Sequence, residues 1–438
     1  MERGEFKVTM SKQEVVAAAL PLQEHWLPLS NLDLLLPPVD VGVFFCYKNE
    51  QSMSFWSMVG ILRKAMAQAL VTFYAFSGEV VQNSVGEPEI LCNNRGVDFF
   101  EAFADVELKD LNLYDPDESI EGKLVPKKKH GVLAVQATEL KCGGMVLACT
   151  FDHRIADAYS ANMFLVSWAE MAQSKSLSLL PTFRRSLLNP RRPGHIDPSL
   201  NDMYVPITAL PPPQNDSDVD QDHLISRIYY VTAEQLDNLQ ALASSNGFKK
   251  TKLESFCAFL WKMVAKSDTK IGCAQKLCKM GIVVDGRTRL SERGNYQSHQ
   301  ASHMATYFGN VLSIPFGGEK VEDLVEKSLN WIGLRLIDRC QPWPRYTAVG
   351  VKRGPAFVVS SGQRFPVLKV DFGWGLPVFG SYHFPWGGNA GYVMPMPSPA
   401  GKGDWIVYMH IFKEQLEFIE REAAHVFKPL TFDYLSQI

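Results

Sequence analysis

Three features that would place a chain in a special class are missing here: long apolar runs, a strong excess of one charge, and repeated cysteine pairs. No run approaches the roughly 18 apolar residues of a membrane span. The N-terminal residues mix charges and lack the apolar core of a signal peptide. The formal net charge of −3 gives no electrostatic basis for binding nucleic acid. We therefore expect a cytoplasmic protein with no membrane or nucleic-acid partner.

The eight cysteines and ten histidines form no pattern typical of a disulfide framework or a metal site. Cys273 and Cys278 lack a second pair at zinc-site spacing, and His299 and His303 lack a third ligand nearby. Several cysteines lie in apolar stretches, as small buried side chains do in a reducing compartment. The pattern therefore favours no metal and no disulfide.

Motifs for covalent catalysis and for nucleotide binding are also absent. There is no G-x-S-x-G nucleophile turn, no Walker loop and no G-x-G-x-x-G loop. We therefore expect neither a covalent intermediate on the protein nor a permanently bound cofactor.

The sequence does contain a histidine placed where it can act as a base. His153 and Asp157 form the chain's one H-x-x-x-D, between an apolar, strand-like run at 145–151 and an amphipathic, helix-like segment. A histidine at such a junction lies at the mouth of a sheet, and its ordinary pKa near 6.5 suits proton transfer at neutral pH. The Asp157 carboxylate can orient the imidazole or pair with an arginine inside the protein. The residues alone leave both roles open.

A second motif, DFGWG at residues 371–375, gives the first one a context. The two motifs, in this order, resemble those of the BAHD family of plant coenzyme A-dependent acyltransferases. Further segments resemble family motifs in order and spacing: LSNLDLL at 29–35, LVTFYAFSGEV at 70–80, VDGRTRL at 284–290 and YFGN at 307–310. Phe76 and Glu79 depart from the residues usual in the family.

A chain of 438 residues is long enough for two domains. A proline-rich stretch at 181–221 is typical of a surface connection, so we expect acyltransferase domains at 1–180 and 222–438. Periodicity predicts helices at 53–70, 251–266 and 321–340, a helix after His153, and a hairpin within 131–151. The resemblance implies an α/β fold of two sandwiches similar to chloramphenicol acetyltransferase. An active-site channel would lie between them, and part of 357–404 would complete the first sheet.

The resemblance also implies roles for single residues. His153 would be the general base in direct transfer from acyl-CoA, the cosubstrate, within a monomer. Asp157 would pair with an arginine, the role that we favour for it over orientation of His153. Asp371 would be structural and would pair with Arg287. The other candidate contacts for coenzyme A and substrate lie at helix starts and turns: Lys252, Ser255, Asp285, Arg287, Ser360, Ser361 and Gly362.

The acceptor is predicted from one substitution. Residues 360–364 stand where shikimate and quinate hydroxycinnamoyltransferases have T-S-W-T-R, and Gly362 replaces the tryptophan. A glycine there predicts a wider pocket. Nearby rings favour a flat aromatic acceptor: Phe357, Phe365, Phe379, Tyr382, Phe384 and Trp386. The sequence is also similar to coniferyl alcohol acyltransferases, so we predict O-acylation of a monolignol-like alcohol by a short-chain acyl-CoA. The alternatives are hydroxycinnamoyl transfer to shikimate, quinate or an amine, and a degenerate lyase or binding protein.

Overall fold

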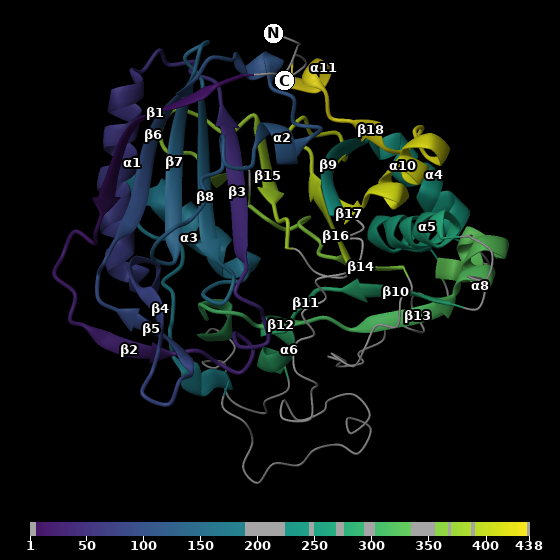
Figure 1. Cartoon of the computed structure of the whole chain (residues 1–438), viewed down its shortest axis with the longest axis horizontal. Helices are drawn as coiled ribbons and strands as arrows, with labels where there is room; N and C mark the ends of the chain where they lie inside the picture. Colours follow the sequence, from purple (N-terminus) through teal and green to yellow (C-terminus); the bar gives the residue numbers. More distant parts are fainter. Residues whose placement is uncertain are drawn as a thin grey trace, which may run out of the picture.

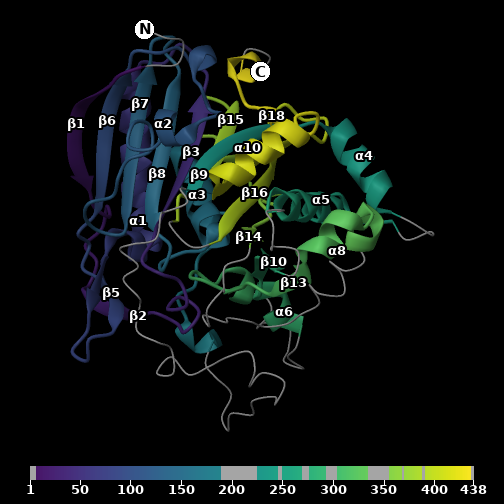
Figure 2. The ribbon, with the colours of Figure 1, turned by 45° about the vertical axis from the view of Figure 1, so that its right-hand side comes forward.

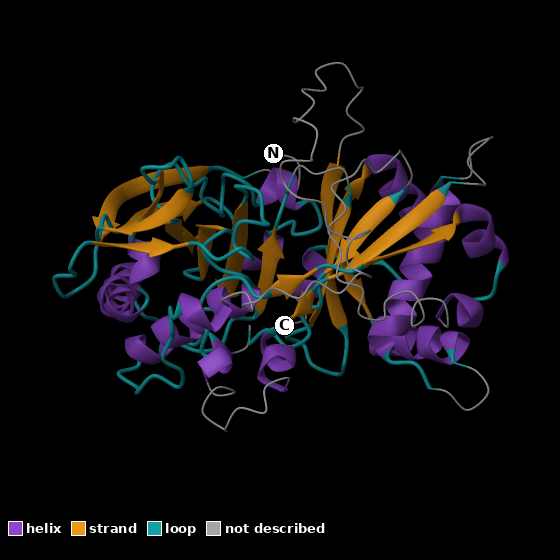
Figure 3. Cartoon of the chain, turned by 90° about the horizontal axis from the view of Figure 1, so that it is seen from below, coloured by secondary structure: helices purple, strands orange, loops and turns teal. Residues whose placement is uncertain are grey.

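The computed structural model describes residues 6–188, 224–244, 249–268, 276–292, 303–333, 355–366, 369–386 and 390–435. These residues form two α/β halves that lie side by side, each with a large sheet and helices against it (Figure 1). In the view from below, the helices of each half gather along one side of its sheet (Figure 3). Within the described residues, no helix is long and apolar enough to cross a membrane.

The first half is built on a six-stranded sheet in which only β6 and β7 are parallel neighbours. Its strands, in spatial order, are β1 (Val8–Val16), β6 (Val97–Ala104), β7 (Leu133–Leu140), β8 (Met145–Asp152), β3 (Asp40–Tyr47) and β15 (Phe379–His383). Helices α1 (Phe55–Thr72) and α3 (Ala158–Ala172) pack together, with Trp168 Nε1 donating a hydrogen bond to the Leu62 carbonyl at 2.9 Å. A small sheet of β2 (His25–Pro28), β5 (Pro88–Cys92) and β4 (Glu79–Gln82) lies beside them.

The second half is built on a seven-stranded sheet. Its strands, in spatial order, are β13 (Phe316–Lys320), β10 (Leu277–Ile282), β14 (Ala356–Val359), β16 (Gly391–Pro397), β17 (Trp405–Phe412), β9 (Leu224–Val231) and β18 (Lys428–Pro429). Its longer helices are α4 (Ala233–Ala243), α5 (Lys252–Ser267) and α10 (Lys413–Glu422), and its shorter helices include α6 (Arg287–Glu292), α8 (Val321–Glu326) and α11 (Phe432–Leu435). Apolar side chains alternate along β17, so that Val407, Met409 and Ile411 share a core with α5 and α10. The intervening Tyr408 and His410 face the first half.

One strand crosses between the halves. β15 comes late in the chain, between β14 and β16, but it pairs with β3 and completes the first sheet. In Figure 1, β15 lies between β3 and β9 of the second sheet, and Figure 2 shows the same two sheets after a turn of 45°. The two halves are therefore interleaved in sequence. Of the predicted linker at 181–221, residues 181–188 are described, with Thr182 bridged to Tyr307.

Most predicted elements are present close to their expected limits. The predicted hairpin is β7–β8, and the predicted helices at 53–70 and 251–266 are α1 and α5. The predicted helix at 321–340 is wrong as one element, because α8 ends at Glu326 and its C-cap Lys327 takes extended backbone angles. Beyond residue 333 this prediction lies outside the described residues, as do Cys273, Cys340 and His299.

Candidate active site

His153 directly follows β8, at the end of the first sheet. Its backbone N–H donates a hydrogen bond to the Val39 carbonyl at 2.9 Å, and its ring lies 5.7 Å from the ring of Phe384. The imidazole lines a cavity of about 1490 Å³ whose walls come from both halves of the chain. A strand end therefore presents this histidine to the space between the halves.

The surroundings of His153 favour the neutral imidazole. Burial lowers its pKa below the ordinary value of 6.5, against smaller opposite effects of backbone carbonyls and the Asp157 carboxylate. Nδ1 has no hydrogen-bond partner among the described residues. A histidine that is neutral at physiological pH can accept a proton from a bound molecule.

Two other sequence motifs hold the His153 backbone in place. Asn310, the last residue of YFGN, donates its side-chain N–H to the His153 carbonyl at 2.9 Å and to Asp33 at 2.9 Å. Asp33, from the LSNLDLL segment, is fully buried and also accepts hydrogen bonds from the backbone and hydroxyl of Ser30. The connection fixes the backbone at His153, because a buried carboxylate with several donors has little freedom to move.

Asp157 points away from His153 and is fully buried. It caps the N-terminus of α3 by accepting the Ser160 N–H, and it accepts two hydrogen bonds from the Arg287 guanidinium at 2.8 and 3.1 Å. No hydrogen bond joins Asp157 to the His153 ring among the described contacts. The predicted pairing of Asp157 with an arginine is confirmed.

The predicted ion pair between Asp371 and Arg287 is wrong. Asp371 accepts hydrogen bonds from the N–H groups of Gly373 and Gly375 in its own loop. This loop packs on Tyr47. Tyr47 is at the end of β3 opposite to the end near His153, and seven residues of strand separate the two ends by roughly 23 Å. Arg287 instead holds Asp157, Ser160 and the carbonyl of Gly309. The contacts of Asp371 favour the structural role that we predicted for it.

The cavity wall near His153 is mainly apolar and aromatic. Of the predicted rings, Phe365, Tyr382, Phe384 and Trp386 line it, whereas Phe357 and Phe379 are buried in the cores. Further wall residues come from both halves: Val39, Phe151, Tyr392 and Met394.

Gly362 does not widen the cavity in the way that the sequence predicts, and it is absent from the cavity wall. A Cβ added there would lie 2.6 Å from the Met396 side chain and 3.1 Å from the ring of Phe365. The space next to this glycine is therefore filled by the protein, and Phe365 supplies the neighbouring wall. The prediction failed because a missing side chain creates space only where no neighbour occupies it.

The predicted coenzyme A contacts divide into two groups. Asp285, Arg287, Ser360 and Ser361 line the cavity. Ser255 does not, since it is fully buried and donates its hydroxyl to the Thr251 carbonyl at 2.9 Å. Lys252 is outside the wall and pairs with Asp237 at 2.7 Å. The same turn instead presents Thr251 and Leu253 to the cavity.

Sequence reasoning missed three polar groups of the wall. The amide of Asn162, the hydroxyl of Tyr382 and Nε2 of Gln363 are buried without a partner of ordinary hydrogen-bond geometry in the described part of the chain. Such groups are costly unless a bound molecule satisfies them. The signal for Asn162 was available, because an asparagine interrupts an otherwise apolar face of the helix after His153.

Known proteins resemble this chain along nearly its whole length. Shikimate O-hydroxycinnamoyltransferase of Nicotiana tabacum is 27% identical over 440 residues, covering 92% of this chain and 96% of that protein. (Z)-3-Hexen-1-ol acetyltransferase of Arabidopsis thaliana is 28% identical over 411 residues, covering 86% of this chain and 84% of that one. Each is a named acyltransferase.

Solved structures share the fold. Vinorine synthase superimposes with a TM-score of 0.72 at 19% identity, and the match covers 97% of this chain and 100% of that one. TRI101 of F. graminearum, in complex with coenzyme A and T-2 mycotoxin, gives a TM-score of 0.72 at 12% identity over 92% of this chain and 99% of that one. The predicted two-domain α/β fold is thereby confirmed.

A family model described as Transferase family matches residues 6–341 and 337–426. This match and the relatives above show that the chain belongs to the BAHD acyltransferases of the Transferase family, in agreement with the histidine at the mouth of the first sheet.

Proposed function

We propose that this enzyme transfers a short-chain acyl group from coenzyme A to the primary alcohol of a monolignol-like phenylpropanoid. One observation carries the proposal: the basic imidazole of His153 faces a cavity whose nearest walls are rings. Aromatic walls bind a flat aromatic acceptor through its faces and edges. An acceptor bound there would bring its hydroxyl to the imidazole.

The chemistry requires one proton to move twice. The acceptor oxygen attacks the thioester carbonyl carbon while His153 takes the hydroxyl proton. Collapse of the tetrahedral intermediate breaks the carbon–sulfur bond, and the imidazole returns the proton to the coenzyme A thiolate. The amide of Asn162 and the hydroxyl of Tyr382 interact with each other in the cavity wall, and both can donate hydrogen bonds to a bound molecule. Neither step needs a covalent bond to the protein.

The expected coenzyme A contacts follow from the wall composition. Thr251, Asp285 and Ser361 lie on the second-half side of the cavity, and Ser360 lies beside them. We propose that the pantetheine and phosphates run along this side, while the acceptor enters among the rings. Lys252 stays a proposed phosphate contact, because its side chain is partly exposed next to this turn.

A second candidate is hydroxycinnamoyl transfer to shikimate, the reaction named for the tobacco relative. It is favoured by Arg364, an exposed residue of the cavity wall. A guanidinium binds a carboxylate through two hydrogen bonds, and shikimate carries a carboxylate whereas coniferyl alcohol does not. The two candidates therefore differ in whether Arg364 contributes to acceptor binding.

The test is a competition. The purified chain is incubated with acetyl-CoA or p-coumaroyl-CoA and with equal concentrations of coniferyl alcohol and shikimate, and free thiol and both ester products are measured. We expect faster acylation of coniferyl alcohol, unchanged in Arg364→Gln. Faster acylation of shikimate that is lost in Arg364→Gln would favour the second candidate. No thiol release with either donor, across a panel of alcohols and amines, would leave only the non-transferring alternative.

A further inference from the structure

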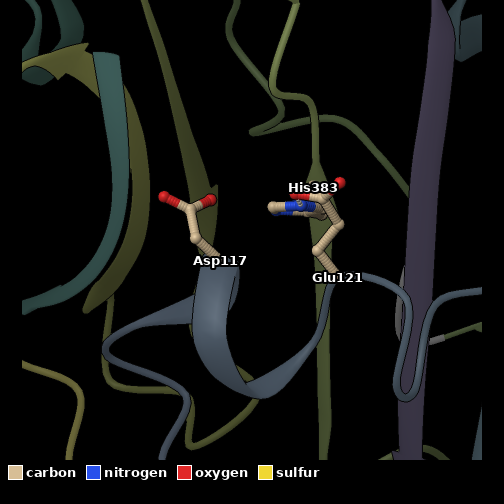
Figure 4. Close-up of side chains that lie close together, drawn as sticks. All are labelled: Asp117, Glu121 and His383. Carbon is tan, nitrogen blue, oxygen red and sulfur yellow. Dashed lines mark ion pairs between the residues drawn. The ribbon is translucent and has the colours of Figure 1, made fainter. Parts of the chain in front are cut away.

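A second cluster of ionisable side chains lies behind the cavity wall. Tyr382 lines the cavity, so the next residue of β15, His383, points to the opposite face of the sheet. There it meets Asp117, in the short helix α2 (Pro116–Ser119), and Glu121, which follows that helix. Figure 4 shows both carboxylates rising from one segment beside the imidazole of His383.

The donor atoms have the spacing of a metal site. One nitrogen of His383 and one oxygen each of Asp117 and Glu121 all lie within 4.8 Å of one another. His383 Nε2 and Glu121 Oε2 are 3.6 Å apart, longer than a hydrogen bond. Tetrahedral zinc with bond lengths of about 2.0–2.1 Å separates its ligand atoms by roughly 3.3 Å. A small movement of the side chains therefore suffices to close the site around an ion.

Each carboxylate is anchored by one oxygen and offers the other. Asp117 Oδ2 accepts the Ser226 N–H at 2.6 Å, while its Oδ1 is buried and has no hydrogen-bond partner among the described residues. Glu121 Oε1 lies 3.3 Å from Lys127 Nζ, which leaves Oε2 directed toward His383. The oxygen that holds each side chain is thus separate from the oxygen that faces the cluster.

The histidine at the centre is deeply buried and poorly satisfied. His383 is 2% exposed, and neither of its ring nitrogens makes a hydrogen bond within the described residues. Its ion-pair contact with Glu121 spans 3.6 Å, and an oxygen of Asp117 lies within 4.8 Å. A buried imidazole normally has a partner on at least one nitrogen, so this arrangement indicates a ligand that completes the cluster.

A second buried histidine comes from the other half of the chain. His410, on β17, is 4% exposed and shares a 2.9 Å hydrogen bond with Ser226 Oγ through Nδ1, while Nε2 has no partner in the described part of the chain. It interacts electrostatically with Asp117, Glu121 and His383. Ser226 thus orients both Asp117 and His410, as residues behind metal ligands commonly do.

We propose that Asp117, Glu121 and His383 bind a divalent cation of the zinc class, with water in the fourth position. One imidazole and two carboxylates suit zinc, whereas magnesium and calcium prefer sites made of oxygen. The ion would also neutralise two carboxylates that face a buried imidazole. The site was not predictable from spacing in the sequence, because its ligands come from the α2 segment and from β15.

Such an ion would lie where the two halves of the enzyme meet. Asp117, Glu121 and His383 belong to the first half, and Ser226, which holds Asp117, belongs to the second sheet. Phe384, whose ring contacts His153, directly follows His383. The ion would hold the end of β15, and with it the aromatic wall of the cavity, without touching the substrates. This proposal does not depend on which acceptor the enzyme uses.

The test measures bound metal in the full-length chain. The protein is loaded with Zn²⁺, desalted, and analysed by elemental mass spectrometry beside Asp117→Asn and Glu121→Gln. Asn can still accept the Ser226 N–H, so Asp117→Asn keeps that contact. Glu118→Gln is the matched control, because Glu118 is exposed on the same helix and loses the same charge. We expect one zinc per wild-type and control chain, and loss of most zinc from the two ligand variants.

Thermal unfolding gives a second readout. Added Zn²⁺ should raise the Tm of wild type and of Glu118→Gln by a few degrees, because an ion that binds only the folded chain stabilises it. Mg²⁺ should not, and neither ligand variant should respond to Zn²⁺. The proposal is overturned if wild type retains no zinc and shows no shift, or if folded Asp117→Asn and Glu121→Gln retain as much zinc as the control.

Discussion

At the residue scale, the role of His153 predicts a large and specific loss of activity. Replacing His153 by alanine removes the base but no part of the packed core, because the ring lines the cavity. Turnover should fall by a factor on the order of 10²–10⁴ with an unchanged thermal unfolding curve. His425→Ala, at an exposed position, is the control. Near-normal turnover of the His153 variant at neutral pH would refute the assignment.

The pH dependence of the rate follows from the same residue. Transfer needs the neutral imidazole, and burial lowers the pKa of His153 below 6.5. Activity should therefore persist below pH 6.5 and fall only as the pH passes down through this lowered pKa. We expect kcat/KM, which reports the free enzyme, to show an acid limb with its midpoint below 6.5. A midpoint above 6.5 would mean that the environment stabilises the charged ring.

Asp157 and Arg287 should behave as one unit. Removing one partner of a buried ion pair leaves the other charge uncompensated, so Asp157→Ala should lower the free energy of unfolding by about 3–5 kcal/mol. Asp371 is only partly buried and holds two loop N–H groups, so Asp371→Ala should cost less, about 1–2 kcal/mol. Urea unfolding of each variant measures both.

A double-mutant cycle separates the two possible partners of the arginine. Asp157→Asn and Arg287→Gln should show a coupling energy, whereas Asp371→Asn and Arg287→Gln should be additive, because the second pair is far apart. If Arg287 couples to Asp371 and not to Asp157, the ion pair that the sequence predicted is correct after all.

The sequence motifs identified residues of this site, but they did not identify the contacts that these residues make. H-x-x-x-D and the apolar run before it located His153 at a strand end, as observed. The partner of Arg287 lies 130 positions away, and the resemblance implied the aspartate of the wrong motif, Asp371. The link from Asp33 through Asn310 to the His153 backbone likewise depends on segments 277 positions apart, which no local pattern specifies.

At the element scale, two glycines should respond to alanine in opposite ways. Gly375, in the DFGWG turn, has φ of +119° with nothing within 4 Å of an added Cβ, so its cost comes from the backbone alone. Gly375→Ala should destabilise by ~1–2 kcal/mol. Gly60 is exposed inside α1 and equally unobstructed, so Gly60→Ala should stabilise by ~0.5–1 kcal/mol. Thermal unfolding of the two variants compares their stabilities. If both variants are destabilised, packing around each glycine determines the change in stability, and the backbone angle does not.

Local signals predicted elements well and failed where a partner element decides the outcome. The hairpin expected within 131–151 is present as β7 and β8, and the helix expected at 251–266 is α5, which begins at a threonine cap. Apolar periodicity continues past Glu326, yet α8 ends there. Periodicity records which residues face a core, and a helix can break without changing that pattern. The place of β15 in the first sheet came from family resemblance, since its sequence does not identify β3 as its neighbour.

At the scale of the whole molecule, the interleaving of the halves predicts that the first half cannot fold alone. A fragment that ends within residues 189–223 retains β3 but loses β15. The β3 side chains from Val43 to Cys46 are almost fully buried, and an unpaired apolar edge strand promotes aggregation. We expect this fragment to be insoluble when expressed by itself.

Supplying the missing strand should reverse the defect. Coexpression with a fragment that starts in the same region and ends at residue 438 provides β15, so the two fragments should copurify with acyltransferase activity. Ser381→Pro in the second fragment tests the strand pairing itself. Proline cannot donate to the β3–β15 ladder, so this change should reduce recovery of the first fragment. A soluble, monomeric first fragment with a cooperative thermal transition of its own would show that β15 is an addition to an independent domain. In that case the first half would fold without the second, and only the cavity, whose walls come from both halves, would require the two together.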